Sequence, residues 1–509
     1  MTILAAVIAL MYWVWLKNGW WQLGLSVVNT VFLAGIWKGK KEIRKNKYLV
    51  GLWLVSLAIG WFQTWRNYEE VKVVSILSLL ALNGYLAALG TEPKVALSLG
   101  RIWMSAWKTI PDFFGEIFGL SKYLKQSAQV KVKGQINWGK IGMATIFAIP
   151  MMLVFGGLFY SADPIFANLV NRIHLPVINI SGKTVFELVA TGICFGVTAT
   201  LAKFKLADER EGEGMEKDEG LRDGLIWASG VVAGLFAVFT IIQVRYWGVS
   251  GDDLRQMGIT FSEYTRKGYS EMLLAAGGAL GLAYLLNRFK GSRAAAKIGL
   301  VLLTLTVIIV LSATKRNYLY QATYGFTRIR LIGYFLSAWM VTALTLAGIK
   351  INQTRNDDWF FRKVIALTAV AVLAVNVANI DKMIVSINPP NLGYDTDYYY
   401  ATNLSADAAE YYPVVIEALE KKLISQNVNW EELMWIRMAN RELIEKTESL
   451  RRQRENNWQN LARWNGSSAK AVKILESNWE KLGEINRLIA ENEKRLGEID
   501  SARRKDGQG

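Results

Sequence analysis

The sequence predicts an all-α membrane protein: a polytopic transmembrane helix bundle of about eleven spans, followed by a soluble α-helical hairpin domain at the C-terminus. Three observations predict this fold class. Hydrophobic residues make up 52% of the 509 residues, although the last hundred or so residues are polar. Apolar windows of about 17–22 residues recur before that tail, and each is long enough to cross a hydrocarbon layer of about 30 Å. The tail itself carries apolar residues at helical spacing.

The candidate spans follow one another along the first three quarters of the chain. They lie near residues 2–16, 19–37, 48–62, 71–90, 141–161, 184–202, 224–244, 271–287, 298–313, 331–349 and 364–380. The first and third are short, and residues 2–37 have a re-entrant hairpin as an alternative. The N-terminus lacks a basic region and a small-residue cleavage site, which indicates a retained helix rather than a signal peptide.

Changes in composition divide the chain into four predicted parts. These are N-terminal transmembrane hairpins (1–90), an inner amphipathic segment (91–138), a core transmembrane bundle (139–381) and an extramembrane helical domain (382–509). The second part mixes Trp, Phe and Ile with Lys and Arg at roughly helical spacing. This pattern is typical of a helix that lies in the membrane interface.

The polar tail predicts two long amphipathic helices over 429–463 and 468–503, joined at Asn465-Gly466. Four apolar residues in the second helix are spaced by seven, which fits a helical hairpin or a short coiled coil. The simpler meaning of this stripe is the domain's own core, and binding of a protein partner or self-association is the alternative. The four residues are Leu475, Leu482, Ile489 and Leu496.

The net charge of +16 is concentrated between the predicted spans, because the tail 382–509 holds 19 Lys and Arg against 20 Asp and Glu. This distribution favours the lipid bilayer, with anionic headgroups on the inner side, over nucleic acid as the partner. With the N-terminus inside, inner loops carry 26 Lys and Arg and outer loops carry 12. The positive-inside rule therefore predicts a multi-pass cell-membrane protein with a cytoplasmic N-terminus and an extracytoplasmic C-terminal domain.

Three consecutive spans each contain two glycines four residues apart. Small residues at this spacing let helix backbones approach closely in lipid. The sequence therefore predicts a tightly packed central bundle, and close packing is the simpler meaning than a ligand cavity. The glycines are Gly192, Gly196, Gly230, Gly234, Gly277 and Gly281.

Sequence signatures of common chemistry are missing. The chain has no GxxxxGK[ST] phosphate loop and no GxSxG nucleophile elbow. The one cysteine, Cys194, and the one histidine, His174, exclude a disulfide within the chain and a zinc site of the usual type. No ionisable residue lies near the centre of a predicted span, where ion-coupled transporters usually place one. The sequence therefore predicts no catalytic residue, metal or cofactor.

Acids, arginines and tyrosines gather at the helix ends that face outward in this orientation. The planar fork of arginine suits a carboxylate or a phosphate. Two interpretations stay open: the charges neutralise one another and clamp helix ends, or an arginine faces an anionic ligand such as a lipid headgroup. The candidate outer-face polar cluster consists of Asp163, Arg245, Glu263, Tyr264, Arg266, Tyr324, Arg328 and Asp381.

Several ordered motifs in these stretches carry a family resemblance. They are "SADPIF" (161–166), "ITFSEYTRKGYSEML" (259–273), "RNYLYQATYGFTRIRL" (316–331) and "LSADAAEYYP" (404–413). Over about residues 140–470 the chain resembles the bacterial membrane proteins known as domain of unknown function 4153/4173, and "ARWNGSSAKA" (462–471) resembles a segment near the family's end. The resemblance implies a polytopic membrane fold and no established activity.

The sequence favours a non-enzymatic integral membrane protein, such as an envelope sensor, scaffold or accessory subunit. A transporter of an anionic or lipid-like solute is the first alternative, and a water-filled path would favour it. A membrane enzyme acting on lipid-linked substrates is the second, with Asp163 or Glu263 as acid or base. It requires a carboxylate that faces a cleft without an arginine partner.

Overall fold

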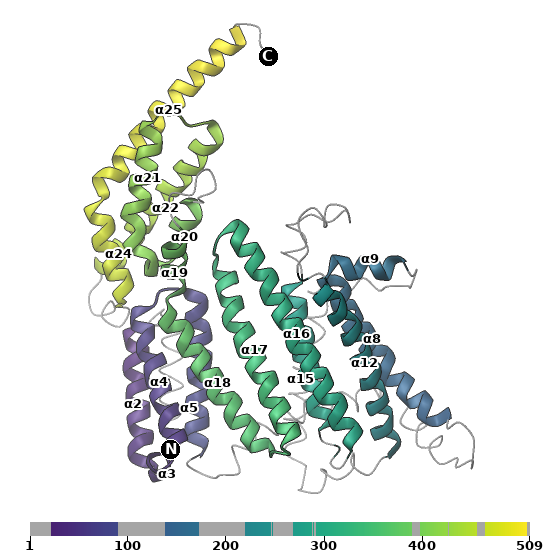
Figure 1. Cartoon of the computed structure of the whole chain (residues 1–509). Coiled ribbons are helices and arrows are strands. Elements are labelled where there is room, and N and C mark those ends of the chain that lie inside the picture. The colour runs from purple at the N-terminus through teal and green to yellow at the C-terminus, as the bar shows by residue number, and fades with distance from the viewer. Residues whose placement is uncertain are drawn as a thin grey trace. The chain divides into compact units, whose positions relative to one another are not determined.

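A computed structural model of the chain (Figure 1) describes ten stretches of residues. They are 22–89, 138–172, 219–245, 247, 268–287, 289, 292–388, 398–425, 427–455 and 464–505. All regular elements in these stretches are helices, and none is a strand. The predicted all-α class is therefore confirmed.

Seven helices of the described stretches are long and apolar enough to cross a membrane, and a bent pair raises this number to eight. The seven are α4 (Lys47–Trp65), α5 (Glu69–Leu89), α12 (Glu219–Arg245), α15 (Tyr269–Leu286), α16 (Arg293–Tyr324), α17 (Arg328–Asn352) and α18 (Asp357–Ala378). The bent pair is α8 (Trp138–Ala162) with α9 (Pro164–Arg172), which meet at 119°. The fold is a polytopic helix bundle, as predicted.

The predicted spans and the observed helices agree closely where they can be compared. With the shorter apolar helix α2 (Leu23–Gly39), nine described helices coincide with nine of the eleven predicted spans. The other two predictions, 2–16 and 184–202, lie outside the described residues, as does the interfacial segment 91–138. The agreement follows from helix geometry, because only an unbroken apolar helix satisfies its own backbone across lipid.

The chain forms two compact units. Unit 1 comprises residues 1–91, 326–332 and 369–509, and unit 2 comprises residues 92–325 and 333–368. These units run across the boundaries of the four parts predicted from composition. The four-part division stays a prediction about the order of segments along the chain.

The C-terminal helices of unit 1 build one hydrophobic core. They are α20 (Tyr398–Asn403), η2 (Ala406–Tyr411), α21 (Tyr412–Ile424), α22 (Trp430–Glu455), α24 (Gly466–Ser477) and α25 (Trp479–Lys505), and the short helix α19 (Ile380–Ile387) precedes them. The stripe spaced by seven lies in this core: Leu475 and Leu482 are fully buried and Leu496 packs at its edge. The predicted single helix over 468–503 is wrong in one respect, because it ends at Ser477 and resumes at Trp479 as α24 and α25. The stripe on these two helices packs against α21 as well as α22, so α21 joins the predicted pair of long helices.

One asparagine joins this domain to a membrane helix within unit 1. Asn465 is the N-cap of α24, where its side chain accepts a hydrogen bond from the backbone N–H of Ser468. Its Nδ2 donates to the carbonyl of Arg66, at the end of α4, at 2.9 Å. A helix leaves donors unsatisfied at its start and acceptors unsatisfied at its end, and one amide serves both needs. Trp464 adds an edge-on contact with Trp65, with ring centroids 5.6 Å apart.

Neutral polar side chains join α2, α4 and α5 inside unit 1. The Nδ2 of Asn29 donates to the carbonyl of Ser56 at 3.0 Å, and the Nδ2 of Asn83 donates to the Oδ1 of Asn29 at 2.7 Å. The hydroxyl of Ser56 donates to the Oδ1 of Asn83 at 2.8 Å and closes the ring. Hydrogen bonds of this kind hold membrane helices together, because lipid offers the amides no partner.

The core of unit 2 is aromatic and contains a close helix approach at a glycine. Phe159 of α8 stacks on Phe239 of α12 with ring centroids 3.9 Å apart. A Cβ placed on Gly278 of α15 would lie 2.9 Å from the Phe155 ring, so this position has no room for a side chain. The missing side chain of Gly278 therefore lets the Phe155 ring of α8 lie against the backbone of α15.

The glycines predicted from GxxxG spacing have looser surroundings. A Cβ added at Gly234 or Gly277 would meet nothing within 4 Å, and one at Gly230 would meet Ile298 at an ordinary 3.8 Å. Gly281 is partly buried, whereas Gly192 and Gly196 lie outside the described residues. The close contact is therefore made by Gly278 and not by its predicted neighbour Gly277. Spacing alone does not fix which face of a helix meets another helix.

Candidate functional site

Four of the eight candidate polar residues have described side chains, and they divide between two clusters. Arg328 and Asp381 meet in unit 1, Asp163 has different partners in unit 2, and Arg245 is exposed in the last turn of α12. Glu263, Tyr264 and Arg266 lie outside the described residues, as does the side chain of Tyr324 in the last turn of α16.

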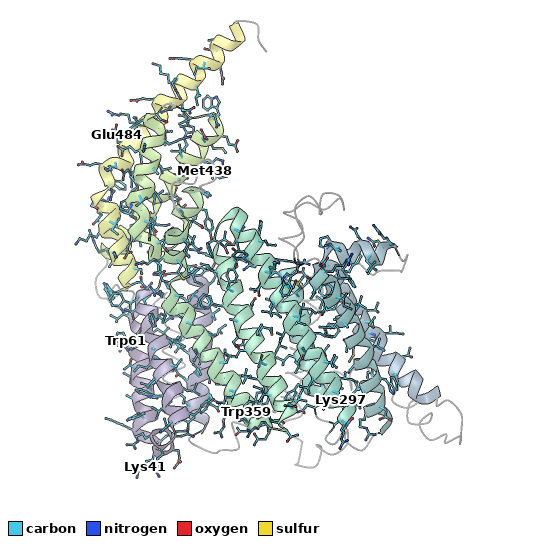
Figure 2. All side chains as sticks on the ribbon, viewed as in Figure 1. Lys41, Trp61, Lys297, Trp359, Met438 and Glu484 are labelled. Carbon is cyan, nitrogen blue, oxygen red and sulfur yellow. The ribbon has the colours of Figure 1, made fainter. Side chains whose placement is uncertain are left out.

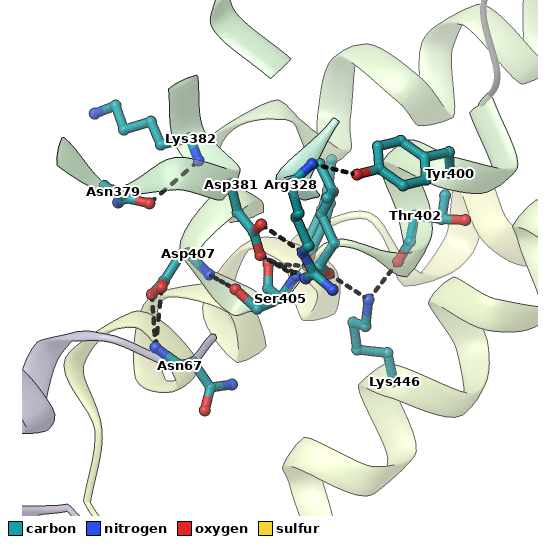
Figure 3. Close-up of polar contacts among 12 residues, drawn as sticks. Asn67, Arg328, Asn379, Asp381, Lys382, Tyr400, Thr402, Ser405, Asp407 and Lys446 are labelled. Carbon is teal, nitrogen blue, oxygen red and sulfur yellow. Dashed lines mark hydrogen bonds and ion pairs between the residues drawn. The ribbon is translucent and has the colours of Figure 1, made fainter. Parts of the chain in front are cut away.

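The first cluster, the Arg328 cluster, surrounds the carboxylate of Asp381 (Figure 3). Arg328, the first residue of α17, donates from Nε to Oδ1 at 2.7 Å and from Nη2 to Oδ2 at 2.6 Å. The backbone N–H of Ser405 donates to Oδ2 at 2.8 Å. The Asp381 side chain is 0% exposed and that of Arg328 is 23% exposed. Two parallel hydrogen bonds make this the strongest geometry of an arginine–carboxylate pair.

Local sequence fixes both partners of this pair. Asn379 adopts φ +50° and caps α19 by accepting from the backbone N–H of Lys382 at 3.1 Å, so Asp381 lies in the first helical turn. Helix N-termini favour a negative charge, which stabilises the Asp381 carboxylate there. The backbone just before Arg328 is held by Asn388, whose side chain accepts from the N–H of Phe326 and donates to its carbonyl.

Two tyrosines complete the surroundings of the guanidinium. The Tyr68 ring lies under it, with the Cζ of Arg328 4.3 Å from the ring centroid. The hydroxyl oxygen of Tyr400 accepts a hydrogen bond from the backbone N–H of Arg328 at 3.0 Å. Burial raises the pKa of Tyr68 to about 12 and also raises the pKa of Tyr400. Both hydroxyls therefore stay protonated at neutral pH, and Tyr68 serves as a neutral aromatic face for the cation.

Asp407 and Lys446 extend the cluster through backbone groups. Both oxygens of Asp407 lie 3.0 Å from the backbone nitrogen of Asn67, and burial raises the pKa of this carboxyl. The amine of Lys446 on α22 donates to the carbonyls of Thr402 and Leu404. The Lys446 contacts hold the segment that brings Ser405 to Asp381.

Lys446 makes the stability of unit 1 depend on pH. Burial lowers its pKa from 10.5 to about 8, so the unfolded state binds more protons between these values. The free energy of unfolding is therefore expected to rise from pH 8 toward pH 10, by about 3 kcal/mol at most. Denaturation of the full chain at pH 7.5, 8.5 and 9.5 measures this slope. K446M is expected to flatten it, while K421M, at an exposed position of α21, keeps it; an unchanged slope in K446M would refute the assignment.

The second cluster, the Asp163 cluster, lies in unit 2 where α8 ends. Arg316 of α16 donates from Nη2 to the Oδ2 of Asp163 and, at 2.8 Å, to the Oε1 of Gln243. The Nε2 of Gln243 donates to Asp163 in turn, and Ser312 donates to Gln243 at 2.8 Å. The side chains of Arg316 and Asp163 are 5% and 1% exposed. The cluster is a buried ion pair in which the amide of Gln243 bonds to both charged side chains.

Asp163 also makes the bend between α8 and α9. Its Oδ1 accepts from the backbone N–H groups of Ile165 at 2.7 Å and Phe166 at 3.0 Å, which makes it the N-cap of α9. Pro164 occupies the first helical position, where a missing N–H carries no penalty. One carboxylate therefore caps a helix with one oxygen and pairs with Arg316 through the other.

Two features of the turn before α15 require a glycine at position 268. A substitution there should therefore be destabilising. Gly268 has φ +91°, and a Cβ there would overlap the backbone of Ala162, next to Asp163. G268A is expected to lower the free energy of unfolding by more than about 2 kcal/mol, because backbone strain alone amounts to 1–3 kcal/mol. Thermal denaturation measures this change against G277A, whose added methyl would meet nothing within 4 Å. Equal stability of the two variants would contradict the contact with Ala162.

The described parts of the four motifs thus contribute Arg328 and Ser405 to the first cluster, Asp163 and Arg316 to the second, and the contact at Gly268. A family model described as "Domain of unknown function (DUF4153)" matches residues 2–412. The chain belongs to this family. The match starts well before residue 140, at which the resemblance of the quoted motifs begins. It ends before the "ARWNGSSAKA" segment, which the resemblance includes. No curated protein and no solved structure matches the chain.

Sequence reasoning did not place Gln243, Tyr400 or Lys446 in the site. The available signal for Gln243 was an amide in an otherwise apolar span. Tyr400 and Lys446 act mainly through backbone groups, and no residue pattern encodes such contacts. In this DUF4153 protein Asp381 and Asp163 act as counter-ions of arginines, and Asp163 also caps α9. The described residues contain no group of three or more His, Cys, Asp or Glu that could hold a metal ion.

Proposed function

We propose that this DUF4153 protein is a non-enzymatic scaffold or accessory subunit of the cell envelope. One observation carries the proposal: the guanidinium of Arg328 is engaged by both oxygens of Asp381, and Asp381 also accepts from the backbone of Ser405. An arginine held in this way is a clamp between helix ends. The motif residues therefore serve to fix the extramembrane helices of unit 1 onto its membrane helices.

The segments that pack at the two ends of α4 support one orientation of this scaffold in the membrane. The basic helix α3 (Lys41–Lys45) packs at the start of α4, and α24 packs at its end. The 19 residues of α4 have a helical length of about 28 Å, which matches the hydrocarbon layer. Basic residues at the start of α4 favour a cytoplasmic location for that end. The extramembrane domain then lies on the extracytoplasmic side, available to envelope partners.

The Asp163 cluster is the observation that favours the first alternative, a transporter of an anionic solute. Arg316 is buried in a membrane-crossing helix, and ionisable groups within membranes often mark substrate pathways. Against this, Asp163 already neutralises the guanidinium, and the Oε1 of Gln243 accepts a second hydrogen bond from it. The scaffold remains the function that the described contacts support better.

Isolation of the full chain from native membranes in mild detergent tests the scaffold. A protein that co-purifies at a fixed ratio, and that cross-links to the extramembrane domain before lysis, would support it. In the R328A variant, the weakened clamp should reduce both the ratio and the cross-link. A full chain that is recovered alone and cross-links to no protein would count against the proposal.

A further inference from the structure

A basic surface lies at one end of the three N-terminal membrane helices in unit 1. Figure 1 shows α3 beside the adjoining ends of α2 and α4, and Figure 2 labels Lys41 at this end. Residues 38–47 contain six Lys and Arg and a single acid, Glu42. This density of like charge is far above that of the neutral C-terminal domain.

The fold holds α3 in place while it leaves the charges outside. Ile43 is 0% exposed and anchors the short helix against α2 and α4. The amine of Lys40 donates to the carbonyl of Ala87, in the last turns of α5, and is buried. The remaining five cations are exposed: Lys38, Lys41, Arg44, Lys45 and Lys47. We call these five residues the α3 basic surface.

Aromatic residues mark the level of this surface relative to a bilayer. The rings of Trp37 and Trp53 lie 4.9 Å apart on α2 and α4, and the Trp53 indole donates to the carbonyl of Leu33 at 3.0 Å. Tryptophan is enriched at the height of lipid headgroups. Exposed apolar residues such as Val31 and Leu54 continue along the same two helices. Cations that adjoin a tryptophan pair and a lipid-facing apolar surface lie at the height of lipid phosphates.

We propose that the α3 basic surface is a binding site for anionic phospholipids of the inner leaflet. Lys41, Arg44 and Lys45 project from one short helix and offer charges to neighbouring phosphodiesters, while Ile43 and Lys40 keep that helix rigid. Because the backbone of α3 is already held in place, it loses little conformational entropy when a headgroup binds. The site is independent of the proposed scaffold function, since it uses no residue of either polar cluster.

Titration of the purified full chain in neutral detergent with phosphatidylglycerol or phosphatidylcholine, followed by native mass spectrometry, tests this site. Each cation near an anionic surface contributes about fivefold in affinity. The full chain is expected to bind phosphatidylglycerol at least about tenfold more tightly than phosphatidylcholine. The triple variant K41Q/R44Q/K45Q should bring this ratio to within about twofold, and 0.5 M salt should do the same.

Two matched variants and one competitor make the test decisive. K41R/K45R keeps the charges and should bind like the unchanged chain. The triple variant K421Q/K473Q/K481Q removes the same charge from exposed positions of the extramembrane domain and should keep the tenfold ratio. An unchanged ratio in K41Q/R44Q/K45Q, or an equal loss in the control triple variant, overturns the proposal. Displacement of the lipid by glycerol phosphate at equal concentration would also overturn it, since the ligand would then be a soluble anion.

Discussion

Replacement of Arg328 by alanine is expected to lower the free energy of unfolding of unit 1 by about 3 kcal/mol. The reason is the carboxylate left behind: Asp381 is 0% exposed and would keep only the N–H of Ser405 as a donor. Breaking a buried ion pair by removing one partner has an effect of about 3–5 kcal/mol. The lower value applies because 23% of the Arg328 side chain reaches solvent. Denaturation of the full chain in micelles, monitored by proteolysis of the C-terminal helices of unit 1, measures the change.

The matched control for R328A is R441A on α22. Arg441 pairs with Glu445 one turn away, and its side chain is 78% exposed. Its removal is expected to leave the free energy of unfolding unchanged, because solvent screens an ion pair that is so exposed. The double variant R328A/D381A should recover part of the loss, because no buried charge remains unpaired. A fully stable R328A that loses binding of an anion would contradict the clamp and favour the ligand interpretation of this arginine.

The membrane helices were predictable because lipid imposes a simple rule on sequence. A helix that crosses hydrocarbon satisfies its own backbone and needs an apolar surface, so α16 and α17 appear in the sequence as apolar windows. The burial of Leu475 and Leu482 was predictable from their seven-residue spacing, although the structure places them on two successive helices, α24 and α25. In each case the pattern lies within one short segment of the sequence, so no contact between distant segments has to be known.

The partners in the candidate site were harder to predict because they join distant segments. Arg328 and Asp163 were both singled out, yet nothing in their spacing shows that one pairs with Asp381 and the other with Arg316. The bend at Asp163 and the positive φ of Asn379 set these pairings, and both depend on capping geometry that composition does not reveal. The buried contacts of Lys446 could not be predicted, because a lysine in a polar helix usually lies in solvent.

The Asp163 cluster predicts an asymmetry between its two charges. D163A removes the counter-ion of the buried Arg316 and the N-cap of α9 together. Its expected effect is about 3–5 kcal/mol from the unpaired charge, with about 1 kcal/mol more from the lost cap. R316M should be milder, because Asp163 keeps two backbone donors and the Gln243 amide. Thermal denaturation of the reconstituted full chain ranks the two variants, and a larger loss in R316M would contradict the capping role.

The double variant D163N/R316M separates a structural pair from a transport site. Asparagine caps a helix about as well as aspartate, and methionine fills much of the arginine volume without a charge. Buried ion pairs replaced in this way often keep their stability, so the double variant is expected to unfold within about 1–2 kcal/mol of the unchanged chain. If the pair only holds α8, α9 and α16 together, the variant should also keep its partner in co-purification. A stable double variant that fails to move an anionic solute, where the unchanged chain moves it across reconstituted vesicles, would instead assign Arg316 to the solute's path.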